Sequence, residues 1–256
     1  MIKFFELAGR PLIYIFEEAG RMLLLLFSAF AWMLRPPFRL RIIFKQMEFV
    51  GVNSIVIIVI TGTFTGAVLA LQSYYGFKMF GGESLVGSTL TLAMTRELGP
   101  VFAALMVTGR AGSAMAAELG AMRVNEQIDA LYSMSVNPIQ YLVMPRIIAG
   151  ILMLPALTVI CDFMGVLGGY FVGVKILGIN SGIFVAKIIE IVDIDDILNG
   201  LIKAVFFGLI LTLVGCYKGF YATGGAKGVG MATTQSVVLS SVTILISDYF
   251  LTAAMF

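Results

Sequence analysis

The sequence predicts an all-α integral membrane protein, with an N-terminal interfacial helix, five transmembrane helices and a short cytoplasmic helix between the second and third spans. Three observations support this fold class. Of the 256 residues, 59% are hydrophobic and 12% are charged, whereas soluble domains are about 45–50% apolar and about 25% charged. The mean hydropathy is +0.99. Five long stretches contain at most two charged residues each. This composition argues against a soluble enzyme and against a disordered chain.

The first element is the interfacial region, residues 1–47. Its apolar run, Met22–Leu34, has only 13 residues and lies between Arg21 and Arg35. A spanning helix needs about 20 apolar residues, so we expect this helix to lie in the membrane interface, where Trp32 is well suited. A signal peptide is a poorer interpretation, because acidic residues precede the run and no cleavage site is apparent.

The next elements are five spanning helices. Each stretch is long enough to cross a bilayer, and lipid offers backbone groups no hydrogen-bond partner outside their own helix. The expected spans are 49–75, 84–110, 145–174, 196–217 and 234–256. If the N-terminus is cytoplasmic, twelve Lys and Arg residues lie on the cytoplasmic side and three lie outside. This asymmetry predicts a cytoplasmic N-terminus and a periplasmic C-terminus.

The loop after the second span is predicted to contain an amphipathic helix at residues 116–136. Its apolar residues recur at intervals of three and four, as one helix face requires. These are Ala121, Val124, Ile128 and Leu131. Charged residues occupy much of the remaining surface, namely Glu118, Arg123, Glu126 and Asp129. Such a helix can dock on a soluble partner or rest on lipid, and its spacing alone favours neither.

Five ionisable residues lie within the spans: Arg96, Glu97, Asp162, Lys203 and Asp248. Each costs about 2.5–3.5 kcal/mol at the bilayer centre unless it is paired, neutralised or hydrated. A cluster of Glu97, Lys203 and Asp248 is possible at similar depth, and Arg96 needs a different partner because it points about 100° away from Glu97. The cluster can transmit motion, fix helix register as a static ion cluster, or relay protons.

Small residues recur at four-residue spacing in two spans, at Gly62 and Gly66 and at Gly165, Gly169 and Gly173. Such spacing allows helices to approach closely. The chain has no convincing internal repeat, so a transport pathway would form more naturally by dimerisation of the five spans. Because such spacing is common in membrane bundles, it does not by itself distinguish a dimer seam from packing within one chain.

Other classes of function are disfavoured by the composition. The net charge of +2 provides no basic field for nucleic acid. The chain contains no His, which is the commonest metal ligand and proton carrier, and we predict neither a metal site nor a cofactor. Cys161 and Cys216 lie in apolar stretches and are expected to be small core residues. No phosphate-binding loop is present, so the chain cannot hydrolyse ATP by itself.

A long segment, RELGPVFAALMVTGRAGSAMAAELGAMRVNEQIDALYSM from Arg96 to Met134, resembles the permease subunits of Mla/MCE-type phospholipid ABC transporters. The similarity extends over nearly the whole chain, through TGTFTGAVLALQ, LIKAVFFG, MATTQSVV and DYFLTAAMF. It implies a permease homodimer in the bacterial inner membrane that moves phospholipid and maintains outer-membrane lipid asymmetry. The implied partners are cytoplasmic ABC ATPase subunits, a periplasmic MCE-domain lipid-binding protein and a small cytoplasmic accessory subunit.

The resemblance also implies roles for particular residues. The loop helix corresponds to the coupling helix that enters a groove on the ATPase, with Glu118, Arg123, Glu126, Asp129 and Leu131 as candidate contacts. Glu97, Lys203 and Asp248 match buried charged positions of the family.

The predicted lipid pocket lies at the outer end of the first span. Leu69, Phe77 and Phe80 match lipid-lining positions of the family, and Gln72 lies on the same stretch. Two neighbouring residues, Tyr74 and Tyr75, can either line the lipid path or belong to an aromatic belt at the membrane interface.

Two departures from the family pattern are visible. Phe77 and Phe80 replace an aliphatic residue and a tyrosine, so a polar headgroup contact at position 80 is in doubt. Met231 and Gln235 replace arginines, so cytoplasmic charge contacts at these positions should be missing.

We therefore expect a non-catalytic permease whose ATP hydrolysis occurs in a separate subunit. Two other classes of function remain open. One is an ion- or proton-coupled secondary carrier that uses the buried charges. The other is a membrane scaffold whose loop helix recruits a soluble protein.

Overall fold

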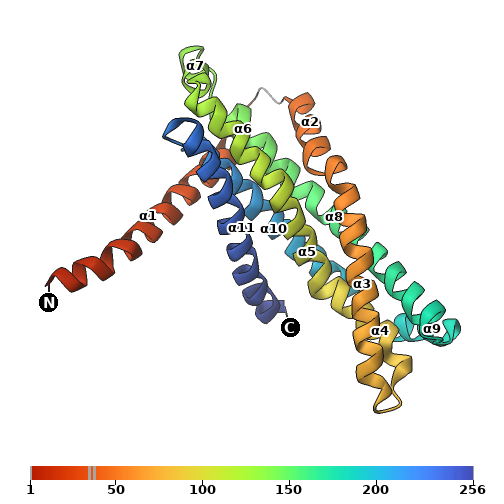
Figure 1. Ribbon diagram of the computed structural model, residues 1–256. Helices are drawn as coiled ribbons and strands as arrows, with labels where there is room; N and C mark the ends of the chain where they lie inside the picture. Colours follow the sequence, from red (N-terminus) through yellow and green to blue (C-terminus); the bar gives the residue numbers. More distant parts are fainter. Residues whose placement is uncertain (1, 34–35, 37–38, 256) are drawn as a thin grey trace.

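The computed structural model describes residues 2–33, 36 and 39–255, and every regular element within these residues is a helix (Figure 1). Five helical stretches are long and apolar enough to cross a membrane. They are Leu40–Lys78, Glu83–Val124, Ile139–Ile176, Ile194–Phe220 and Gly225–Met255. The predicted all-α membrane fold is thus confirmed, and most of its helices extend beyond the apolar cores from which they were predicted.

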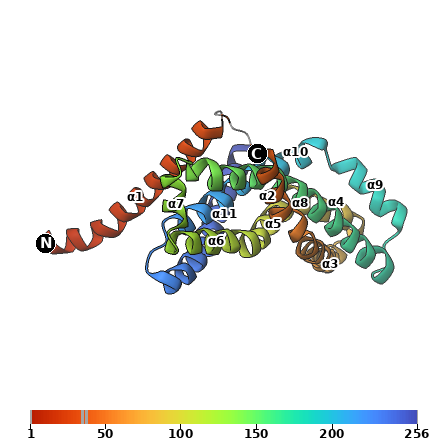
Figure 2. The same cartoon turned by 90° about the horizontal axis from the view of Figure 1, so that it is seen from above.

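The N-terminal region forms one long helix, α1 (Ile2–Met33). Figures 1 and 2 show α1 leading away from the other helices. Its C-terminal part contacts the bundle, where Leu25 and Ala29 are buried in a cluster with Leu142 and Ile147. The interfacial position of α1 stays a prediction.

The first spanning stretch is interrupted near one end. Helix α2 (Leu40–Val50) is followed by the short 3-10 turn η1 (Val52–Ser54) and by α3 (Ile55–Lys78). Arg110, from the second stretch, holds this interruption in place. Its Nε donates a hydrogen bond to Ser54 Oγ at 2.9 Å, and its Nη2 donates to the Phe49 carbonyl.

The second stretch contains two π-helical turns within a long helix. Its parts are η2 (Glu83–Leu85), α4 (Val86–Ala93), η3 (Met94–Leu98), α5 (Gly99–Val107), η4 (Thr108–Gly112) and α6 (Ser113–Val124). The first π turn, η3, contains Arg96 and Glu97, and the second, η4, contains Arg110. Such turns are uncommon and often occur at functional sites.

The loop after α6 does not contain one helix over 116–136. Helix α6 ends at Val124, Glu126 adopts a left-handed conformation with φ 58°, and α7 (Gln127–Ser133) follows. Leu119 and Ile128 are nine residues apart, so a continuous helix with about 100° per residue would place them on opposite faces. The break instead lets both side chains enter one buried cluster. Ala121 and Val124 remain exposed, so the four expected residues do not form one apolar face.

The third stretch joins η5 (Ile139–Val143), α8 (Met144–Tyr170) and η6 (Phe171–Ile176). A helix that the sequence analysis missed, α9 (Ser181–Ile191), follows it. The Asn180 side chain caps α9 by accepting hydrogen bonds from the backbone N–H groups of Gly182 and Ile183. The last two spans are α10 (Ile194–Phe220) and α11 (Gly225–Met255). Figure 2 shows α9 on the opposite side of the bundle from α1.

The recurrent glycines bring α3 and α8 together within one chain. A Cβ atom on Gly66 would overlap the backbone of Gly165, and one on Gly62 would overlap the backbone of Cys161. A Cβ on Gly168 would overlap the backbone of Thr63. The two sets of glycines therefore pack against each other inside the protein, where close backbone contact replaces the side-chain packing of ordinary helices.

Candidate functional site

A buried lysine joins three of the spanning stretches. Lys203 of α10 has no exposed surface. Its Nζ atom donates hydrogen bonds to Glu97 Oε2 at 2.7 Å, to Thr252 Oγ1 at 2.7 Å and to the Arg96 carbonyl at 3.0 Å. Glu97 and Arg96 belong to η3, and Thr252 belongs to α11. The ammonium group has three hydrogens, and three oxygen atoms from two other stretches take them.

The carbonyl of Arg96 is available to Lys203 for a local reason. In an α-helix this carbonyl would accept a hydrogen bond from the N–H group four residues later. That residue is Pro100, which has no N–H group. The sequence RELGP thus frees an acceptor at the same turn that carries Glu97, and Lys203 fills it.

Asp248 has a weaker connection to the lysine. Its Oδ1 atom lies 3.1 Å from Lys203 Nζ, but it receives no hydrogen bond among the described residues. The three hydrogens of the ammonium group already point to other acceptors, so the attraction between Lys203 and Asp248 is electrostatic. We call Glu97, Lys203, Asp248 and Thr252 the ion cluster. With both carboxylates ionised, it carries one more negative than positive charge.

Thr252 extends the ion cluster on α11. Its hydroxyl lies 3.1 Å from Glu97 Oε1 and 2.9 Å from the Asp248 carbonyl. A hydroxyl has one hydrogen, so it can donate to one of these oxygens while it accepts from Lys203. Sequence analysis missed Thr252. Its spacing of four residues from Asp248, on the same helix face, was the available signal.

Arg96 joins the ion cluster through its backbone carbonyl. Its side chain turns to Asp196 of α10, with Nε and Nη2 at 2.7 and 2.6 Å from Oδ1. The other oxygen of Asp196 accepts a hydrogen bond from the Asp193 N–H at 3.1 Å and caps α10. Arg96 therefore has the different partner that its position on the helix required. The Asp-x-x-Asp spacing at the helix start was a capping signal that the sequence analysis did not use.

Asp162 lies apart from the ion cluster. Its carboxylate contacts Gly99, where a Cβ atom would collide with it, and its Oδ1 atom has no hydrogen-bond partner among the described residues. The absence of a side chain at Gly99 therefore makes room for the Asp162 carboxylate beside the first π turn.

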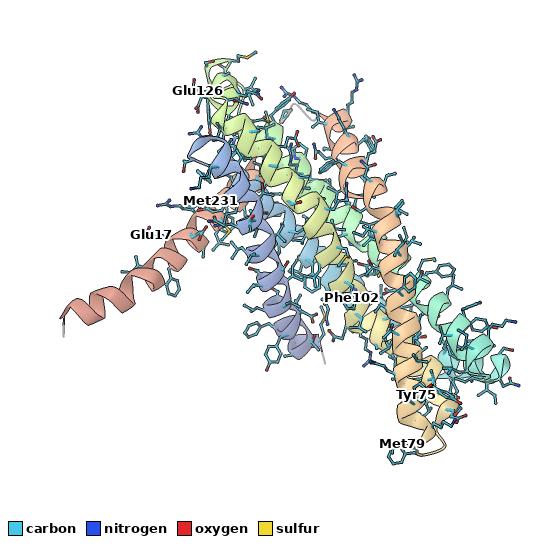
Figure 3. The ribbon with its side chains drawn as sticks, in the orientation of Figure 1. Glu17, Tyr75, Met79, Phe102, Glu126 and Met231 are labelled. Atoms are coloured by element: carbon cyan, nitrogen blue, oxygen red, sulfur yellow. The ribbon has the colours of Figure 1, made fainter. Side chains whose placement is uncertain are left out.

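An apolar hollow of about 410 Å³ lies between α3 and the second stretch. It is lined by Phe64, Thr65, Val68, Leu69, Gln72, Leu98 and Phe102. Leu98 directly follows Glu97, so the hollow borders the turn that carries the ion cluster. Figure 3 shows Phe102 in the middle of the bundle, well away from Tyr75 and Met79 at the far end of α3.

Two of the four predicted lipid-pocket residues lie in this hollow, and two do not. Leu69 and Gln72 line it. Phe77 packs with Leu69 and Tyr74 against another cluster, and Phe80 is 87% exposed beyond the end of α3. The structure of one chain therefore does not bring the four residues together, and a shared role for them stays a prediction.

The residues predicted to contact an ATPase differ in their surroundings. Glu118 pairs with the buried Arg146 at 2.8 Å, and Arg123 pairs with Asp129 at 2.6 Å across the α6–α7 turn. Leu131 packs partly into the apolar cluster that contains Ile128. Glu126 is exposed at the tip of the turn (Figure 3). The tip is therefore held by ion pairs and apolar packing, and Glu126 projects from it.

The chain is similar to known proteins over most of its length. The family described as "Permease MlaE" matches residues 43–254. A probable ABC transporter permease protein of Rickettsia conorii is 48% identical over 90% of this chain and 88% of its own length. The intermembrane phospholipid transport system permease protein MlaE of Haemophilus influenzae is 41% identical over 83% of this chain and 82% of its own.

A plant protein is also similar. The chloroplastic protein TRIGALACTOSYLDIACYLGLYCEROL 1 of Arabidopsis thaliana is 39% identical over 83% of this chain and 61% of its own length.

Proposed function

The chain belongs to the MlaE permease family, and on that premise we propose that it is the membrane subunit of an ATP-driven phospholipid transporter. One observation carries this proposal. The family match extends from residue 43 to residue 254, so it includes nearly all of the five spanning stretches, together with the ion cluster and the α6–α7 turn. The names of the bacterial relatives add a phospholipid cargo and an ABC-type energy source.

The energy source must lie in another protein. This sequence contains neither the G-x-x-x-x-G-K-[ST] loop of ABC-type ATPases nor another nucleotide-binding fingerprint. We propose that cytoplasmic ABC ATPase subunits bind at the α6–α7 turn, and that an MCE-domain protein exchanges lipid with the permease on the periplasmic side. The protein then resides in the bacterial inner membrane, with a cytoplasmic N-terminus and a periplasmic C-terminus.

The hollow beside α3 is the proposed site of the lipid. It is apolar except for Gln72 and Thr65, and its volume lies within the usual range of about 300–1,000 Å³ for ligand pockets. Phe64 and Val68 at its wall are 68% and 53% exposed in one chain. A second permease can cover this open side, and we propose that a homodimer completes the lipid pocket.

We propose that the ion cluster connects the hollow to helices that move during transport, α10 in particular. It ties η3, α10 and α11 together next to Leu98, which lines the hollow. A change in the position of α10 would therefore move the wall of the lipid site. A static cluster that only fixes helix register is the alternative, and the double variants described below separate the two.

Co-purification with an ATPase tests the assignment. We expect the tagged permease, extracted from its native membrane in mild detergent, to bring an ATPase with it, and phospholipid to stimulate that ATPase. A permease that purifies without an ATPase and transports in response to membrane potential or a proton gradient would instead be a secondary carrier.

A further inference from the structure

A second groove lies far from the hollow, between α1, α10 and α11, near the end of α10. Its first section, of about 270 Å³, is mainly polar. Polar and charged side chains that line this section include Glu18, Arg21, Lys218, Tyr221, Thr223 and Gln235. A second section, of about 350 Å³, continues along α11 past Val238, Leu239 and Val242. Glu18, Lys218 and Gln235 line both sections, so the two form one groove with a polar end and an apolar end.

The length of the groove matches one leaflet of a bilayer. Its lining on α11 begins at Gly228 and ends at Val242, and the Cα atoms of two helical residues fourteen positions apart are about 21 Å apart. A bilayer with its headgroup regions is about 40–45 Å thick, so one leaflet is about half of that. The polar section lies at the end of the bundle, and the apolar section reaches the middle of α11.

The polar section is rich in hydrogen-bond donors. Arg21 lies 3.6 Å from Glu17 in an exposed ion pair, a distance too long for a direct hydrogen bond, so its guanidinium can bind a ligand. Lys218 pairs with Glu18, which fixes α1 against α10 at the centre of the groove. Tyr221 and Thr223 add hydroxyl groups, and Gln235 adds an amide. A phosphate group, which only accepts hydrogen bonds, is the natural ligand of such a set.

Glu18 makes the polar section mixed in charge. Among the described residues that line the groove it is the one carboxylate. It pairs with Lys218 and lies about one helical turn from Arg21 on α1. A headgroup that carries an amine next to its phosphate complements this arrangement better than a purely anionic headgroup does. The charges thus favour an aminophospholipid such as phosphatidylethanolamine.

We propose that this groove binds one aminophospholipid, with its headgroup between Arg21, Lys218 and Glu18 and an acyl chain along Val238 and Val242. The bound lipid contacts α1, α10 and α11 at once and therefore holds the N-terminal helix on the bundle. The site is separate from the hollow between α3 and the second stretch. Lipid binding here does not require that the protein transports lipid, so the failure of one proposal leaves the other standing.

Photocrosslinking of the full-length protein in detergent tests this site. The probe is phosphatidylethanolamine with a photoreactive group on one acyl chain, and mass spectrometry locates the modified residues. We expect modification within 238–242. Val238→Trp fills the apolar section without breaking an ion pair, and it should nearly abolish this crosslink. Val56→Trp, at an exposed position of α3 that lines neither section of the groove, is the control and should leave the crosslink unchanged.

The headgroup contact is tested with a second pair of variants. Arg21→Gln should weaken retention of the lipid about tenfold, as expected for the loss of one charge-assisted hydrogen bond. Lys227→Gln removes a cation from the first turn of α11 that is exposed and does not line the groove, and it should have no effect. Unchanged binding in both Arg21→Gln and Val238→Trp would overturn the proposal.

A second copy of the chain is the competing occupant of the groove. Rapid disulfide formation between two copies carrying Val238→Cys, in native membranes, would show that the partner covers the apolar section. That result would also overturn the proposal. Monomeric Val238→Cys protein that still takes the lipid crosslink would support it.

Discussion

Lys203 donates a hydrogen bond to the backbone carbonyl of Arg96 at 3.0 Å, an acceptor that Pro100 cannot use because it has no N–H group. The interaction connects a break in the hydrogen bonding of one helix to a buried charge on another. It places the ammonium group of Lys203 beside Glu97 and within 3.1 Å of Asp248. The ion cluster depends on this position of the ammonium group.

Neutralising Lys203 should be costly, and removing a carboxylate partner should restore part of the loss. Lys203→Met leaves two carboxylates without a cation, and breaking a buried pair costs about 3–5 kcal/mol. Adding Glu97→Gln should recover more stability than adding Asp248→Asn, because Glu97 receives a hydrogen bond from Lys203 and Asp248 does not. Thermal unfolding in detergent measures the coupling, and strictly additive losses in both double variants would show that the residues do not interact.

The same variants distinguish a static cluster from a moving one. Lipid-stimulated ATPase activity is read separately from the amount of folded permease. If the double variants recover folding but not activity, the charges serve the transport cycle itself. Recovery of both would mean that the charges are needed for assembly alone.

The glycine contact between α3 and α8 should be intolerant of a methyl group. Gly66→Ala places a Cβ atom against the backbone of Gly165, and overpacking costs about 1–3 kcal/mol. Gly76→Ala, on the same helix, is a matched control because no atom lies within 4 Å of its added Cβ. It should be neutral or slightly stabilising, since alanine favours helix over glycine. Equal unfolding midpoints for the two variants would contradict the close packing of α3 and α8.

Charge reversal at the α6–α7 turn should release the ATPase. Glu126→Lys is the cleaner variant, because Glu126 has no ion pair within 4.0 Å among the described residues, whereas Asp129 also pairs with Arg123. Asp129→Lys should weaken both the turn and the docking. The amount of ATPase that co-purifies with the permease is the measurement, with the unfolding midpoint as the control for folding. Normal binding and transport in both variants would remove the coupling role of this turn.

The N-terminus should be accessible only from the cytoplasm. A cysteine introduced at residue 3 is expected to react with a membrane-impermeant thiol reagent in inverted membrane vesicles but not in intact spheroplasts. Cys161 and Cys216 are buried and give little background. Labelling in intact spheroplasts would reverse the topology that the Lys and Arg distribution predicts.

The five spanning stretches could be predicted from the sequence because lipid imposes one strong requirement, a long helix with few charges. The break between α6 and α7 could not. It depends on Ile128 reaching the cluster that contains Leu119, which is tertiary packing, and a local pattern does not report it. Helix α9 was missed because its eleven residues are too few to span, although Asn180 gave a capping signal.

The site was predictable to different degrees. The pairing of Lys203 with Glu97 and Asp248 followed from the cost of isolated charges in lipid. Thr252 and Asp196 were not predicted, since neither a threonine in a span nor an aspartate at a helix start demands a partner elsewhere in the chain. Phe77 and Phe80 were placed by resemblance, and one chain alone does not position them beside Leu69 and Gln72 in the hollow.

Lipid transfer in a reconstituted system tests the central claim most directly. The permease, its ATPase and the MCE-domain protein are placed in liposomes that contain fluorescent phospholipid, and movement of this lipid between the membrane and the MCE-domain protein is followed. We predict that transfer requires ATP, is lost in Lys203→Met, and is insensitive to an imposed membrane potential. Transfer that proceeds without ATP, or that follows the membrane potential in the absence of the ATPase, would contradict the account.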